Sequence, residues 1–108
     1  MSGHAVVLCT AGSEEDASRI AATLVERRLA ACVNVVPGIQ STYRWKGAVQ
    51  TDREWLLLVK TRRDRFEAVR AAIREVHSYE LPEIVMLEIT GGDASYLAWI
   101  DESIAGAD

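Results

Sequence analysis

The segment 31–60 constrains the fold of this 108-residue chain more than any other. It reads as two extended arms, 31–45 and 48–60, separated by Lys46-Gly47, a pair that suits a tight hairpin turn because glycine adopts positive φ at no steric cost. Each arm has about 13–15 residues, whereas a typical strand has about 5–6. A hairpin of this length has more strand surface than the other elements of a 108-residue chain can readily pack against. We therefore expect a partner, most simply another copy of the same chain.

Composition limits the functional classes. With 49% hydrophobic and 26% charged residues, the chain is typical of one globular domain spanning 1–108, with ends that fray at 1–3 and 105–108. A net charge of −4 gives no reason to expect nucleic-acid binding. No apolar run approaches the ~20 residues of a membrane span, and no basic region precedes the first apolar run as in a signal peptide. We expect a cytoplasmic protein.

The remaining pattern predicts the element order β-α-β-β-α-β-α. Continuous apolar runs at 4–10 and 55–59 suit central strands, and Pro37-Gly38 suits an edge strand or a bulge because proline donates no ladder hydrogen bond. Ser13, Thr61 and Asp93 are expected helix caps. The other predicted elements are helices at 13–28, 62–77 and 96–103 and a strand at 84–89.

Two β-α-β units joined by a hairpin favour an α+β, ferredoxin-like fold with an antiparallel sheet in the order 4-1-3-2. This topology makes strands one and three central and strand two an edge, which agrees with the two apolar runs and with Pro37. It also separates Cys9 and Cys32 to opposite ends of the sheet, too far apart for a disulfide.

The same topology brings Cys9 and His77 to one end of the sheet. A thiolate and an imidazole suit copper, zinc or nickel, and Glu83 or Glu80 could add an oxygen ligand. Two alternatives remain open. In the first, Cys9 is only a buried strand residue and His77 only a cation at a helix end. In the second, the pair serves as nucleophile and base. We find no nucleophile elbow and no orienting acid at a fixed spacing, so we expect no enzymatic activity.

Three large aromatic residues, Tyr43, Trp45 and Trp55, lie on the hairpin. Tyrosine and tryptophan are enriched at protein interfaces, and closed cyclic symmetry results when each arm lies on the next subunit. We expect these three residues at an interface between copies of the chain.

Several segments in order give the chain a family resemblance. They are VVLCTAGSEEDASRIAATLVERRLAACVNVVPGIQSTYRWKG, LLLVKT, HSYELPEI and GDASYLAWI. Through them the chain resembles the CutA divalent-ion tolerance proteins from about Val6 to Ile104.

The resemblance implies a tight homotrimer assembled through the long hairpin, similar in architecture to the PII signalling proteins. It implies copper as the most favoured divalent metal, with Cys9 and His77 as ligands. Val76 stands where some members have a second histidine, and Ser78 stands where proline is common. Two functions follow as hypotheses: a trimeric copper-type tolerance protein, or a PII-like signalling or scaffold trimer that binds a small ligand or partner in a cleft between subunits.

Overall fold

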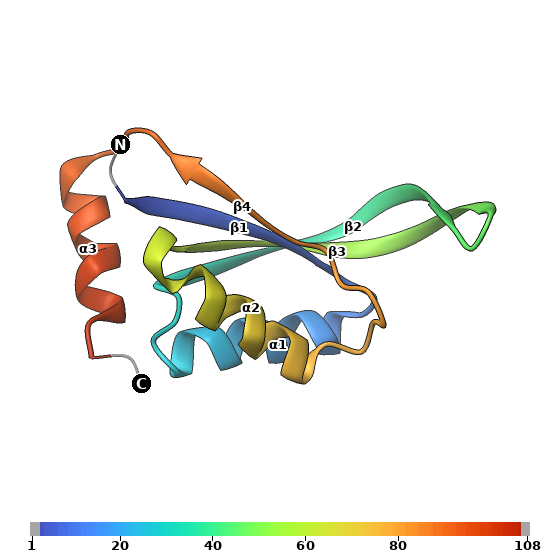
Figure 1. The fold of residues 1–108 in the computed structure, drawn as a ribbon, viewed down its shortest axis with the longest axis horizontal. Coiled ribbons are helices and arrows are strands. Elements are labelled where there is room, and N and C mark those ends of the chain that lie inside the picture. Colours follow the sequence, from blue (N-terminus) through green and yellow to red (C-terminus); the bar gives the residue numbers. More distant parts are fainter. Residues whose placement is uncertain (1–2, 107–108) are drawn as a thin grey trace.

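The computed structural model describes residues 3–106 and has the predicted order of elements (Figure 1). They are β1 (His4–Ala11), α1 (Glu14–Glu26), β2 (Cys32–Trp45), β3 (Ala48–Arg62), the 3₁₀ turn η1 (Arg63–Arg65), α2 (Phe66–Val76), β4 (Ile84–Ile89) and α3 (Ala94–Ile104).

The four strands form one antiparallel sheet in the order β2-β3-β1-β4. This confirms the ferredoxin-like α+β prediction, with β1 and β3 in the centre and β2 at an edge. The predicted bulge is also present, because the β2–β3 register shifts between Val36 and Ile39. Pro37 has no amide proton for the ladder there, and Gly38 has φ 68°.

The hairpin turns at Lys46 and Gly47, which both have positive φ, at 50° and 82°. Two successive residues in this region make the tight turn that matches the right-handed twist of the strands. β3 pairs with β1 only from Trp55 to Arg62, so the rest of the hairpin projects past the end of β1 (Figure 1). The described chain is consequently elongated, at 44 × 26 × 22 Å.

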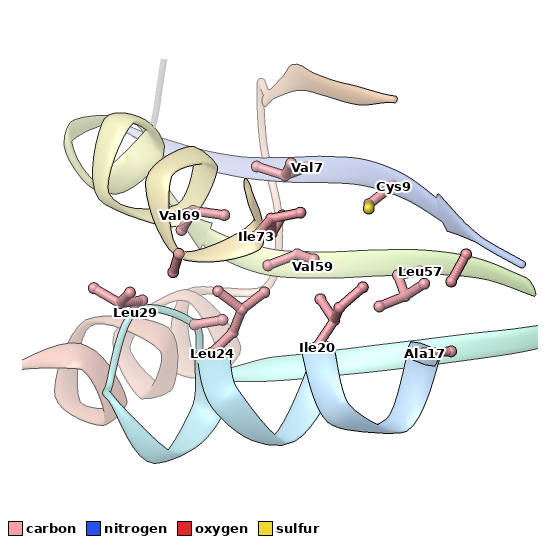
Figure 2. Packing of buried hydrophobic residues seen from close by; sticks show 13 residues of the cluster. Val7, Cys9, Ala17, Ile20, Leu24, Leu29, Leu57, Val59, Val69 and Ile73 are labelled. Carbon is pink, nitrogen blue, oxygen red and sulfur yellow. The ribbon is translucent and has the colours of Figure 1, made fainter. Parts of the chain in front are cut away.

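Two helices, α1 and α2, cover the same face of the sheet (Figure 1). The core between these layers is fully buried (Figure 2). Its main members are Val7, Cys9, Leu57 and Val59 from the sheet and Ile20, Leu24, Val69 and Ile73 from the helices. Alternate strand residues point to opposite faces, so the neighbours of these strand residues in sequence form the second face.

That second face is also apolar, but neither α1 nor α2 covers it (Figure 1). Leu8 pairs with Leu58 on one side and with Val85 on the other, and Val6 pairs with Leu87. Val85 and Leu87 are 45% and 52% exposed. We call this surface the open sheet face: Val6, Leu8, Leu56, Leu58, Val85 and Leu87.

The start of the second helix differs from the prediction. Thr61 is not a helix cap: it remains in β3, paired with Ala5, and is fully buried. Its hydroxyl donates to the Leu29 carbonyl at 2.7 Å, which fixes the connection between α1 and β2. The helical turns therefore start later, with η1, and α2 itself begins at Phe66. A threonine suits both positions, and only the sheet pairing decides between them.

The other two predicted caps are present. Ser13 Oγ accepts a hydrogen bond from the Asp16 amide at 3.1 Å, and Asp93 accepts one from the Tyr96 amide at 3.1 Å. α1 ends at Glu26, slightly before the predicted end, because Arg28 turns into the left-handed region at φ 58°.

At the chain ends, Gly3 accepts a hydrogen bond from the Arg63 amide at 2.9 Å, and Ala105 accepts one from the Arg28 guanidinium at 3.3 Å. Residues 3 and 105 are thus held, and the expected fraying of 1, 2, 107 and 108 lies outside the described residues. Both cysteines are free, as their separation predicted. No helix within 3–106 is long and apolar enough to cross a membrane.

We expect Ile20→Ala to lower the free energy of unfolding by about 2–5 kcal/mol, because it leaves a cavity between α1 and the sheet. Val25 lies on the same helix and is exposed, so Val25→Ala should change stability by less than about 0.5 kcal/mol. Urea unfolding at one fixed protein concentration measures both. Equal losses in the two variants would contradict the placement of this core.

Candidate functional site

The end of β1 brings Cys9 and His77 together. The Thr10 carbonyl oxygen is 2.7 Å from His77 Nε2 and accepts a weaker contact from the Cys9 thiol, at 3.7 Å. The two predicted ligands therefore contact the same backbone oxygen, although 67 residues separate Thr10 from His77.

The hydrogen bonds of His77 define its tautomer. Nε2 must carry the proton, because a carbonyl oxygen only accepts, and Nδ1 in turn accepts a hydrogen bond from the Tyr79 amide at 3.0 Å. Both ring nitrogens are thus engaged within the chain. A metal ion could bind either nitrogen only by displacing one of these hydrogen bonds.

Cys9 is fully buried on the helix-covered face of β1 (Figure 2). Burial, together with the smaller effect of the negative charges of Glu83 and Glu54, raises the pKa of its thiol to about 12. The side chain is therefore a protonated thiol at neutral pH. Because metals bind the thiolate, a metal at Cys9 must displace this proton.

The loop after α2 is tied to α1. Ser78 Oγ donates to Asp16 at 2.7 Å, and the Arg19 guanidinium donates to both Asp16 and the Val76 carbonyl, at 2.6 and 3.0 Å. The hydrogen bond from Ser78 and the adjacent Arg19 lower the pKa of Asp16, so this carboxylate remains charged and holds the loop. These contacts keep His77 against the end of β1.

Tyr79 connects this loop to β3. Its hydroxyl donates to Glu54 Oε2 at 2.6 Å, and its ring lies against that of His77 with centroids 4.7 Å apart. Burial and the hydrogen bond to Glu54 raise the pKa of Tyr79. Glycine at position 12 makes room for the hydroxyl, since a Cβ there would lie 2.8 Å from it. Glu54 itself is only 7% exposed.

An open cleft of about 730 Å³ lies beside these residues, between the loop and the projecting hairpin. Its lining comprises Thr10, Ser41, Thr42, Tyr43, Arg44, Trp45, Glu54, Ser78, Tyr79, Glu80, Leu81 and Glu83. Both carboxylates proposed as extra metal ligands, Glu80 and Glu83, thus belong to the cleft. Within residues 3–106, however, no three histidine, cysteine or acidic side chains converge closely enough to hold a metal ion.

The structure separates the three hairpin aromatics that the sequence had grouped. Tyr43 and Trp45 line the cleft, and the Tyr43 hydroxyl donates to the Asp52 carboxylate. Trp55, in contrast, packs against the chain's own core. A role for these residues at an interface stays a prediction, and for Trp55 such a role must coexist with this packing.

Sequence reasoning missed three residues of the site, namely Thr10, Glu54 and Tyr79. Thr10 acts through its backbone oxygen, which no residue type signals. Glu54 directly precedes the apolar run that begins at Trp55, and a charged residue there looks like ordinary exposed hairpin. The available signal was Tyr79, an aromatic residue in a short polar loop beside the proposed ligand His77.

A family model described as CutA1 divalent ion tolerance protein matches residues 5–103. The divalent-cation tolerance protein CutA of Thermus thermophilus is 52% identical over 98 residues, which cover 91% of this chain and 95% of that protein. The chloroplastic protein CutA 1 of Oryza sativa subsp. japonica is 44% identical over 98 residues, covering 91% of this chain but only 55% of that protein.

Among solved structures, the periplasmic divalent cation tolerance protein CutA of Archaeoglobus fulgidus superposes with a TM-score of 0.91 at 42% identity. The match covers 94% of this chain and 98% of that one. Relatives are thus named as chloroplastic and periplasmic, so the expected cytoplasmic location stays a prediction.

We expect Cys9 to be unreactive in the native protein. In a Cys32→Ser variant, where Cys9 is the only thiol, a disulfide-exchange reagent at pH 8 should react far more slowly with folded than with guanidine-unfolded protein, because burial excludes the reagent and keeps the thiol protonated. Absorbance of the released thiolate follows the reaction. Equal rates in the two states would show that Cys9 is accessible.

Proposed function

This chain belongs to the CutA1 divalent ion tolerance family, and we propose that it functions as a homotrimer that binds copper-type divalent cations without catalysing a reaction. The observation that carries this proposal is the convergence of Cys9 and His77 on the Thr10 carbonyl, beside an open cleft. A sulfur and a nitrogen donor at one point suit copper better than magnesium or calcium, which prefer oxygen ligands.

The donors present fit a weak metal site. Binding at Cys9 requires loss of a proton whose pKa is raised to about 12, and binding at His77 requires loss of a hydrogen bond to Thr10 or Tyr79. Each requirement subtracts from the affinity. Glu83 is the cleft carboxylate whose charge acts most strongly on Cys9, so it is the natural additional ligand. A neighbouring subunit would supply any further donor.

Self-association is supported by two surfaces. The open sheet face presents apolar residues across β1, β3 and β4 that neither α1 nor α2 covers (Figure 1). Exposed apolar surface of this kind is typical of protein interfaces. The hairpin projects past the body, with Tyr43 and Trp45 on one side. Three copies related by cyclic symmetry would bury the open sheet face and bring the hairpin beside a neighbouring subunit, with the cleft between subunits.

The cleft favours a second candidate function, a PII-like signalling or scaffold protein. Its volume of about 730 Å³ is within the range of about 300–1,000 Å³ that small-molecule sites occupy. In this case the cleft holds an organic ligand or a partner segment, and metal binding is secondary.

We expect copper binding to depend on Cys9 and to tighten with pH. Because the bound metal replaces the thiol proton and the thiol pKa is raised, the apparent affinity should rise up to about tenfold per pH unit between pH 7 and 9. Calorimetric titration of the purified oligomer measures this dependence. Cys9→Ser should abolish binding, while Cys32→Ser, which removes the other thiol, should leave it unchanged. If wild type and Cys9→Ser bind copper equally, the site assignment fails.

We expect Leu87→Lys to dissociate the trimer. Leu87 is already half-exposed in the single chain, so lysine there should be tolerated by the fold but not at an apolar interface. Light scattering after size exclusion should give three times the 11.9 kDa chain mass for wild type and a lower mass for the variant. Val25→Lys is the matched control, on an exposed position of α1. A trimer that survives Leu87→Lys would exclude the open sheet face from the interface.

A further inference from the structure

The cleft beside His77 is acidic, and its acids form no ion pair with the residues that the structure describes. Its lining includes three carboxylates, Glu54, Glu80 and Glu83, against a single cation, Arg44. Within residues 3–106, none of these carboxylates forms an ion pair. Elsewhere in the same part of the chain, seven ion pairs engage six other acidic residues.

Glu54 is the unusual member of this group. Glu54 is only 7% exposed. Its hydrogen bond among the described residues is accepted by Oε2 from the neutral Tyr79 hydroxyl. Glu54 Oε1 has no partner among the described residues. Oε1 is not one of the buried side-chain atoms without a partner, so it keeps contact with solvent where Glu54 lines the cleft. A positive group in the cleft can therefore contact this oxygen directly.

Aromatic rings form the remaining walls of the cleft. Tyr43 and Trp45 come from the hairpin and Tyr79 from the opposite loop. Aromatic faces attract cations and also cover methylene groups. Carboxylates and aromatic rings together are the usual surroundings of a protonated amine on an alkyl chain.

A metal ion fits this cleft less well. No three acidic, histidine or cysteine side chains of residues 3–106 converge on one point, whereas calcium requires six or more oxygen ligands and magnesium a near-octahedral set. Separated carboxylates instead match separated charges on one molecule. The volume of about 730 Å³ also accommodates an organic ligand.

We propose that this cleft binds a linear organic polyamine, with one ammonium group at Glu54 and a second at Glu80 or Glu83, and with the methylene chain against Tyr43, Trp45 and Tyr79. The proposal deepens the second candidate function by naming its ligand class, and it does not depend on copper binding. A basic side chain of a second copy is the competing occupant of the same position.

Calorimetry on the assembled wild-type protein, at low salt and with EDTA present, tests this directly. Spermidine is the probe, and diaminobutane and butanediol form a matched pair that differs in charge. Spermidine should bind more tightly than diaminobutane, because its additional ammonium reaches a second carboxylate. Butanediol should not bind. Added salt should weaken the binding of both amines.

Glu54→Gln is the decisive variant, because it removes the charge but keeps an acceptor for the Tyr79 hydroxyl. It should weaken spermidine binding at least about tenfold. Glu26→Gln makes the same charge change at an exposed position on α1, and should alter the affinity less than about twofold.

Three outcomes would overturn the proposal: no spermidine binding by wild type, equal binding by wild type and Glu54→Gln, or equal weakening by Glu26→Gln. The first would indicate that a neighbouring chain fills the cleft, and the third that spermidine binds the acidic surface generally. EDTA makes each outcome independent of copper, and light scattering on the same samples reports the trimer separately. A failure here is thus distinct from a failure of the proposed metal function.

Discussion

The unequal lengths of β1 and β3 determine most of this structure. β1 ends its pairing with β3 at Ala11 and Trp55, while β3 and its partner β2 extend well beyond that point. A strand end leaves backbone groups that need partners, and a projecting hairpin leaves one side of β3 open. The loop after α2 occupies the first of these positions, and the cleft occupies the second. The candidate site is therefore a consequence of where one strand stops.

Several hydrogen bonds hold that loop in place, and each involves a different element. His77 contacts the β1 backbone, Ser78 contacts α1, and Tyr79 reaches β3 through Glu54. Gly12 leaves the space that the Tyr79 hydroxyl occupies. Because these contacts share one short segment, displacing one of them by a ligand would perturb the others. This coupling gives the two proposed ligand classes, a soft metal and an organic cation, a common structural element on which to act.

The chemistry of Cys9 and of Glu54 illustrates how burial changes the role of a side chain. Cys9 lies in the hydrophobic core, where a thiol is stable and a thiolate is not, so its raised pKa opposes metal binding. Glu54 is nearly as buried but lies on the opposite face of the sheet, where it lines the cleft. Cys9 resists ionisation, whereas Glu54 is an acidic group that forms no ion pair within residues 3–106.

By itself, the sequence determined the order of elements, the central and edge strands, the hairpin turn at Lys46-Gly47 and the proximity of Cys9 to His77. These follow from local periodicity, from glycine and proline geometry and from the few allowed topologies. The tertiary structure alone decided that Thr61 pairs in the sheet instead of capping a helix, that Trp55 packs inward, and that Thr10, Glu54 and Tyr79 meet beside a cleft. Those features depend on strand register and on which residues of distant segments face one another. Register is set by pairing across the sheet, and no local sequence pattern encodes that pairing.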